Sequence, residues 1–481
     1  MRARSVVTLA AAVACVAVAA GARPRPFTLE QAVAALTAAD AYETVGRLTQ
    51  PAFEGRLTGT PGYEAAARWA AGEFARAGLT PLAGHRDFMQ RFPVTVNGVG
   101  SATMELLPAD GKGEPEHLQF FKQFMPLLFS GSGEAAAEVV FVGFGITAPE
   151  LGRDDYAGVD VKGKIVMAVR GAPEDGRDWT AHDSHRARTA NARAHGAAGY
   201  LFAESAAANP NGDQIPDLPM ADVTEETANA VLAPSKLTLA ELRAVLEKGG
   251  VASFPTGRRA HLAVVARPPV AGQGANVVAV LQGSDRALAH EYVLVGAHLD
   301  HCGAWPSLLP GADDNASGSA TVLEIARAAA RLAPRPRRSL VFVLFAGEEE
   351  GLLGSKFLAA HPPEEFTRCV AVFNLDMVGV GRGAYVAGGK NFPGLFRLLE
   401  EARDARAPGV VLRAGLSQGE PRADHGPFQA AGLPAVSLFG AGGSHHGYHT
   451  DEDTIWWITP ANMEAIGRIV LDAAVHAADA P

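Results

Sequence analysis

Cysteine is scarce in this chain, with three among 481 residues. Cys15 lies in an apolar N-terminal stretch, so only Cys302 and Cys369 remain for the body of the protein. Two cysteines allow one disulfide at most, which excludes a small cysteine-stapled scaffold. The fold must therefore be stabilised by its hydrophobic core. A content of 48% hydrophobic and 20% charged residues is typical of a globular protein long enough for two or three domains.

Excess positive charge and long apolar runs are also missing from most of the chain. The formal net charge is -10, whereas nucleic-acid-binding proteins normally carry a basic face, so no nucleic-acid partner is expected. The one strongly apolar run lies at the N-terminus, in "MRARSVVTLAAAVACVAVAAGARPRP". It has two arginines before it and small residues after it, and it is shorter than the about twenty residues of a membrane span.

This N-terminal pattern predicts a signal peptide over residues 1–22, cleaved after Ala20 or Ala22. An uncleaved anchor is the alternative. With cleavage, we expect a periplasmic or secreted protein without a membrane span.

Two parts of the remaining chain differ in character. Residues 27–50 and 63–81 have helical spacing, and residues 91–98 alternate like a strand. Short strand-like pieces and helices then predict a small module inserted at 130–267, closed by "RPPVAGQG", which has the composition of a linker. The main domain is thus expected to be discontinuous, over 27–129 and 268–481.

From Ala275 onward, strand-like and helix-like segments alternate. This order predicts an α/β domain whose mostly parallel, mixed sheet is flanked by helices. The expected strands are 276–283, 291–298, 339–346, 370–377, 384–389 and 435–440, and the clearest helices are 318–333 and 392–403.

The stretch "VFVLFAGEEEGLLGS", residues 341–355, ends a buried strand in three glutamates. Carboxylates could simply stand there because the dipole at the start of the next helix favours negative charge. The alternative is an active site, because open α/β sheets build theirs at the carboxyl ends of parallel strands.

Other strand ends and loops carry groups of the same kind, and their joint occurrence favours the active site. Alone, each has an ordinary role as a cap, a turn residue or a buried histidine. Together, imidazoles and carboxylates without thiolate suit two divalent ions about 3.5 to 4 Å apart, with one carboxylate between them. The candidates are His298, Asp300, His301, Asp313, Asp314, Asn315, Glu348, Glu349, Asp376 and His449.

The segments "VGAHLDH", "GADDNASG", "AGEEEGLLGS", "NLDMVG" and "YHTDEDT" resemble the M28 family of zinc metallopeptidases. The resemblance runs from Ala275 to the C-terminus and includes the early "EGRLTGTPG". The inserted part, with "VGFGI", "DYAGVDVKGKIV" and "NARAHGAAG", resembles a protease-associated (PA) domain. The resemblance implies a phosphorylase/hydrolase-like fold, two Zn2+ ions per chain, and an exopeptidase acting on peptides or small proteins, chiefly an aminopeptidase.

Carried onto this sequence, the resemblance implies a division of labour among the site residues. Asp314 would bridge the two ions, and its bond to Asn315 would be a cis peptide. Glu348 would stay off the metal as the general base for water held between the ions. The other ligands would be His298 and Asp376 for one ion, and Glu349 and His449 for the other.

Four further side chains have weaker assignments. Asp300 is expected to accept the second N–H of the His298 imidazole. Tyr448 is expected either to donate a hydrogen bond to the developing oxyanion or to pack. Asp424 is a candidate for supporting the ligands or binding substrate, and Glu350 is expected in solvent.

Three alternatives stay open. A carboxypeptidase or dipeptidase would use the same scaffold, and no carboxylate for a substrate ammonium is evident, since Gly447 stands before Tyr448 where some relatives have an acid. A glutaminyl cyclase would use one zinc, with Ser where this chain has Asn315. A non-catalytic receptor-like protein would be expected to have lost ligands.

Overall fold

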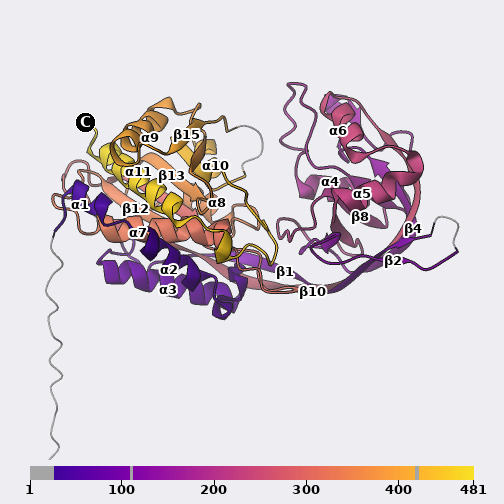
Figure 1. Ribbon diagram of the computed structural model, residues 1–481, viewed down its shortest axis with the longest axis horizontal. Helices are drawn as coiled ribbons and strands as arrows, with labels where there is room; N and C mark the ends of the chain where they lie inside the picture. Colours follow the sequence, from indigo (N-terminus) through magenta and orange to yellow (C-terminus); the bar gives the residue numbers. More distant parts are fainter. Residues whose placement is uncertain (1–25, 109–111, 418–421) are drawn as a thin grey trace, which may run out of the picture.

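The computed structural model describes residues 26–108, 112–417 and 422–481, and the predicted signal peptide lies outside them. Two lobes are joined by a long two-stranded ribbon (Figure 1). Within the described residues, no helix combines the length and the apolar character that crossing a membrane requires. Cys302 and Cys369 are both buried and free, so they form no disulfide.

The larger lobe is built on a mixed sheet at whose centre three strands run parallel. These are β11 (Glu291–His298), β12 (Ser339–Phe345) and β13 (Arg368–Asp376). The sheet continues with β16 (Ala435–Gly440), which is parallel to β13, and then with β14 (Gly383–Ala387) and β15 (Val411–Ala414). The predicted strands and the α/β class are thus confirmed in this lobe.

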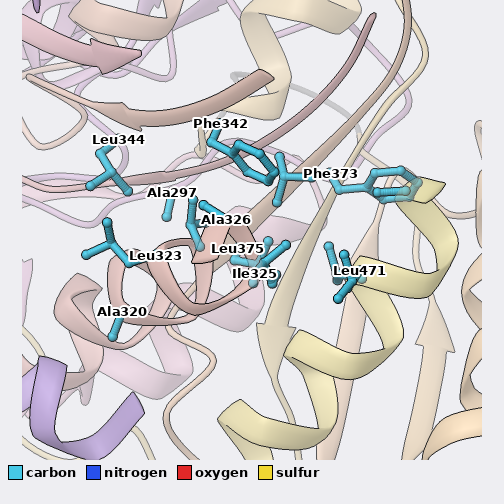
Figure 2. Close-up of a cluster of buried hydrophobic side chains, with 14 of the residues drawn as sticks. Ala297, Ala320, Leu323, Ile325, Ala326, Phe342, Leu344, Phe373, Leu375 and Leu471 are labelled. Atoms are coloured by element: carbon cyan, nitrogen blue, oxygen red, sulfur yellow. The ribbon is translucent and has the colours of Figure 1, made fainter. Parts of the chain in front are cut away.

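Helices cover both faces of this sheet, and every residue of β12 is therefore buried. Leu340, Phe342 and Leu344 point to one face, where they pack with α7 (Gly318–Ala329) and α11 (Pro460–Asp479) (Figure 2). Val341, Val343 and Phe345 point to the other face. There they pack with side chains of α8 (Leu353–Ala360) and α10 (His425–Ala430). A continuous apolar run is the sequence pattern that two covered faces require.

The N-terminal helices complete the first face. The predicted segment 27–50 is two helices, α1 (Leu29–Ala34) and α2 (Ala38–Leu48), because Thr37 caps a new start through its side chain. Next, α3 (Pro61–Ala77) begins after the cap Thr60 and ends at Gly78 in the left-handed conformation. The remaining helix of the lobe, α9 (Pro393–Arg406), packs on α11.

The second lobe repeats the parallel arrangement on a smaller scale. Its strands β4 (Gly133–Val142), β7 (Ile165–Ala168), β8 (Gly199–Glu204) and β9 (Met220–Thr224) are parallel neighbours, and β3 (Phe124–Pro126) joins β9 antiparallel. Its helices are α4 (His185–Ala194), α5 (Glu225–Leu232) and α6 (Leu239–Glu247). Shorter strands are β2 (Glu116–His117), β5 (Thr147–Ala148) and β6 (Arg153–Asp154), and helical turns lie at Pro149–Leu151 and Ala233–Ser235. In the larger lobe, helical turns at Pro51–Arg56 and Ile455–Trp457 contact α3 and α2.

The ribbon between the lobes consists of β1 (Met89–Leu107) and β10 (Ser253–Leu281), paired antiparallel. Residues 267–274, predicted to be a linker from their composition, do lie between the lobes, but as part of the paired strand β10 and not as an irregular segment. Pro268 and Pro269 are accommodated at a register shift between the Val270 and Arg267 pairs, where prolines interrupt no ladder. An isolated ribbon buries little, which gives it the composition of a linker. The module was proposed to span 130–267. The hydrophobic core of the second lobe also includes Val99, Met104 and Leu106, which precede that span.

Candidate metal centre

Five predicted ligands meet at the carboxyl ends of the central strands. β11 ends at His298 and β13 at Asp376, while Glu349 lies in the turn after β12. The distorted turn Ala312–Ser317 supplies Asp314, and the C-terminal loop supplies His449. All five are buried, with exposed fractions between 1% and 7%. Parallel pairing brings together residues far apart in the sequence.

The five side chains form two groups that share Asp314. In one group, Nε2 of His298 lies 3.2 Å from Oδ1 of Asp314 and 3.4 Å from Oδ1 of Asp376. In the other group, Nε2 of His449 lies 3.0 Å from Oδ2 of Asp314 and 3.0 Å from Oε2 of Glu349. Each oxygen of one carboxylate thus faces a different histidine, which is the placement expected of a bridging ligand.

The donor atoms fit a bound cation better than they fit one another. Nε2 of His449 is buried and makes no hydrogen bond of acceptable geometry, although two carboxylate oxygens lie 3.0 Å away. Three buried carboxylates beside two imidazoles would be costly without added positive charge. Burial alone would raise the pKa of Asp314, but the two imidazoles beside it, those of His298 and His449, hold it well below its usual value, so it stays ionised.

Asp453 and Asp313 hold the turn that carries the shared aspartate. The Asp453 carboxylate accepts hydrogen bonds from the N–H groups of Asp313 and Asp314, at 2.9 and 3.0 Å. Asp313 in turn accepts from the N–H of Gly379 and lies against His445. The peptide bond between Asp314 and Asn315 is cis, as the family resemblance implied. No role was predicted for Asp453, although it stands in the motif "YHTDEDT".

Asp300 does not contact the imidazole in the predicted way. Nδ1 of His298 lies 3.2 Å from the main-chain oxygen of Asp300 and 3.9 Å from its carboxylate. The carboxylate instead accepts hydrogen bonds from the N–H groups of Glu348 and Glu349, at 3.2 and 3.1 Å. The prediction of its partner was therefore wrong, because the chain after β11 turns its carbonyl toward the ring. Asp300 positions the turn that carries both glutamates.

Glu350, expected in solvent, faces inward. Its Oε2 atom is buried without a hydrogen-bond partner, and burial followed by the neighbouring Asp300 raises its pKa well above the usual value. The turn after β12 folds back, with the N–H groups of Gly351 and Leu352 donating to the carbonyl of Glu348. Glu349 is buried as a result, whereas Glu348 and Glu350 are half-buried. Asp424 is also fully buried, and burial raises its pKa to about 7, which makes it a supporting group rather than a lining one.

Arg56 explains the early motif "EGRLTGTPG". Its guanidinium is fully buried and donates to four main-chain carbonyls, those of Leu48, Leu299, Pro310 and Gly311. It therefore fixes the loops on either side of the site. Burial lowers its pKa to about 10, while Asp453, Asp300 and other nearby acids act in the opposite direction.

Two contacts to the ligands were not predicted. Nδ1 of His301 lies 2.9 Å from Oε1 of Glu349, so this histidine orients the glutamate. Ala208, in the second lobe, accepts a hydrogen bond from Nδ1 of His449 at 2.7 Å, and its own N–H donates to the His449 carbonyl at 2.8 Å. That bond leaves Nε2 of His449 free to act as a ligand. A main-chain carbonyl carries no residue-type signature, so sequence could not reveal it.

A cavity of about 420 Å³ lies between the two lobes at this site. The larger lobe contributes Glu348, Glu349, Tyr448 and His449 to its lining. Tyr448 is 48% exposed, and its ring stacks on that of His449 with centroids 3.8 Å apart. The second lobe contributes charged side chains, among them Arg170, Glu204 and Asp222.

Two stretches of the chain match family models. Residues 276–474 match Peptidase family M28, and residues 135–231 match the PA domain. A "Probable leucine aminopeptidase" of Trichophyton verrucosum is 33% identical over 222 residues, which is 43% of this chain and 62% of that relative. The chain thus spans less than two thirds of that relative's length. "Aminopeptidase YwaD" of Bacillus subtilis is 27% identical over 374 residues, covering 73% of this chain and 70% of the relative.

Two solved structures share the fold over nearly the whole chain. An aminopeptidase from Aneurinibacillus sp. strain AM-1 is 25% identical, with a TM-score of 0.65, and the match covers 94% of this chain and 96% of that one. A peptidase M28 structure from Shewanella amazonensis SB2B is 23% identical, with a TM-score of 0.67 and the same coverage of both chains.

Proposed function

Because residues 276–474 form a domain of peptidase family M28 that follows a PA domain in the chain, we propose that this protein is a two-zinc aminopeptidase. The observation that carries the proposal is the placement of Asp314, whose two oxygens face His298 and His449 separately. The N-terminal sequence pattern supports a periplasmic or secreted location.

Zinc is the ion we propose for both positions. The residues that would hold it offer imidazole nitrogens and carboxylate oxygens, which suit zinc in catalytic sites. Cys302 lies close to His301, Glu349 and His449, but burial raises the pKa of its thiol far above the usual value. A neutral thiol is a poor ligand, so the oxygen and nitrogen donors dominate.

Bound zinc ions supply Lewis-acid activation of water and of the scissile carbonyl. Glu348 is the residue we assign to proton transfer, because it lines the cavity beside the ligand Glu349 and makes no ion pair among the described residues. Burial raises its pKa well above the usual value, which brings a carboxylate closer to the pKa of an effective general base. Glu348 accepts the proton of the attacking water and returns it to the leaving amine.

Two neighbours assist this step. Asp300 holds the main-chain N–H groups of Glu348 and Glu349, so the base and the ligand keep separate directions. Tyr448 lines the cavity, and we assign its hydroxyl to the oxygen that becomes negatively charged in the transition state.

Attack at the amino end is supported by the aminopeptidases among the relatives. The test is product identification by mass spectrometry with the purified full chain and an unblocked tetrapeptide beginning with leucine. We expect free leucine to appear first and release to stop after dialysis against a zinc chelator, then to return with added zinc.

Blocked peptides make the test decisive. The N-acetylated tetrapeptide should resist hydrolysis, and the C-terminally amidated one should remain a substrate. First release of the C-terminal residue would identify a carboxypeptidase. A second tetrapeptide, beginning with glutamine, tests the remaining alternative. Cyclisation of its N-terminal glutamine without hydrolysis would identify a glutaminyl cyclase.

A further inference from the structure

The wall of the cavity contributed by the second lobe includes three charged residues on or next to neighbouring strands. Arg170 follows β7, Glu204 ends β8, and Asp222 lies in β9. These three strands are parallel neighbours, so their carboxyl ends meet at one edge, as at the ligand sites of other open α/β sheets. The cavity is thus bounded by two sets of strand ends, one from each lobe.

Asp222 is the unusual member of this wall. Its side chain lines the cavity although the residue is only 3% exposed, and its Oδ1 atom is buried without a hydrogen-bond partner. Arg170, a cation on the same wall, is paired with Glu204 at 3.0 Å. Burial raises the pKa of Asp222 well above its usual value, Glu204 adds to this, and Arg170 and His449 oppose it. A cation placed in the cavity would stabilise this carboxylate.

The other acids among the described lining residues already have partners or roles. Asp183 pairs with Arg188, and Glu204 pairs with Arg170. Glu349 faces His301 and His449, and Glu348 is the proposed base. Asp222 is the remaining carboxylate on the lining. An exopeptidase that attacks the amino end must bind an ammonium, and buried carboxylates form strong charge-assisted hydrogen bonds with such groups.

We propose that Asp222, from the inserted module, binds an ammonium group of the peptide substrate. The inference rests on the proposed function, since it places the substrate in this cavity. The inserted module then selects substrate, instead of only covering the site. The ammonium can come from the substrate's N-terminus or from a lysine side chain, and the two sources are separable.

The experiment is calorimetric titration of the zinc-loaded full chain, wild type against Asp222→Asn. The probes are L-leucine and 4-methylpentanoate, which share a carbon skeleton and differ by the amine, and L-lysine and L-norleucine, which differ by the side-chain ammonium. Loss of a charge-assisted hydrogen bond should weaken leucine binding by roughly 10- to 100-fold and leave 4-methylpentanoate unchanged. Selective loss of the lysine preference over norleucine would instead assign the side-chain ammonium.

Control variants separate this role from a structural one. Glu226→Gln removes the same charge from an exposed position four residues away and should leave all four affinities at wild-type values. Asp222→Val, which suits a buried strand, should reproduce the effect of Asn. Unchanged probe ratios, or equal weakening of every probe, would overturn the proposal. Binding is measured without turnover, so a failed peptidase assay would reject the proposed function separately.

Discussion

Glu348→Gln is expected to lower turnover by roughly 10²- to 10⁴-fold, the range for a lost acid-base group, while zinc content stays at the wild-type value. Gln has the size of Glu but cannot accept the proton of the attacking water. Because Glu348 is not one of the five side chains that form the two ligand groups, its loss should leave metal binding intact. The measurement pairs steady-state kinetics on an amino-acid amide with elemental analysis of the same preparation.

Glu350→Gln is the matched control for this variant. Glu350 stands in the same turn, two residues after Glu348, but does not line the cavity, and Gln matches its size. Turnover should therefore change little. Near-normal turnover of Glu348→Gln, or an equal loss in both variants, would remove the general-base assignment.

Asp314→Asn is expected to abolish activity by a different route, the loss of both zinc ions. The native carboxylate faces His298 with one oxygen and His449 with the other, whereas an amide offers one weaker oxygen donor. Removal of groups that only support a metal ligand already costs roughly 10- to 100-fold in affinity, so loss of a shared ligand should cost more.

Asp376→Asn provides the comparison for that result. Asp376 belongs only to the group around His298, so this variant should lose the ion of one site and keep the other. The measurement is zinc per chain after dialysis against a weak chelator. Equal zinc retention by both variants would show that Asp314 is not shared between two ions.

Sequence predicted the strands of the larger lobe and the place of its candidate ligands because their physical causes are local. A strand buried on both faces must be apolar throughout, as β12 is. Active sites of parallel sheets lie at the carboxyl ends of such strands, which made Glu348, Glu349 and Asp376 recognisable as candidates. Parts of the ribbon were predicted as strands, at 91–98 and 276–283, but the middle of β10 was not, because it is exposed and interrupted by prolines and so lacks the pattern of a buried strand.

Contacts between distant segments could not be predicted. Glu350 was expected in solvent because three adjacent charges resemble an exposed loop, but the turn after β12 leaves it half-buried, with its Oε2 atom out of solvent. The Ala208 carbonyl that orients His449 belongs to a residue 241 positions away and has no distinguishing side chain. Asp222 is a single acid within the apolar strand β9, and only the meeting of the two lobes shows that it faces the catalytic cavity.

Zinc-edge anomalous diffraction from crystals of active, zinc-loaded protein would locate the ions directly. Two peaks are expected, one near His298 and Asp376 and one near Glu349 and His449, with Asp314 touching both. Active protein with a single peak, or with zinc bound away from these five side chains, would contradict the two-metal account.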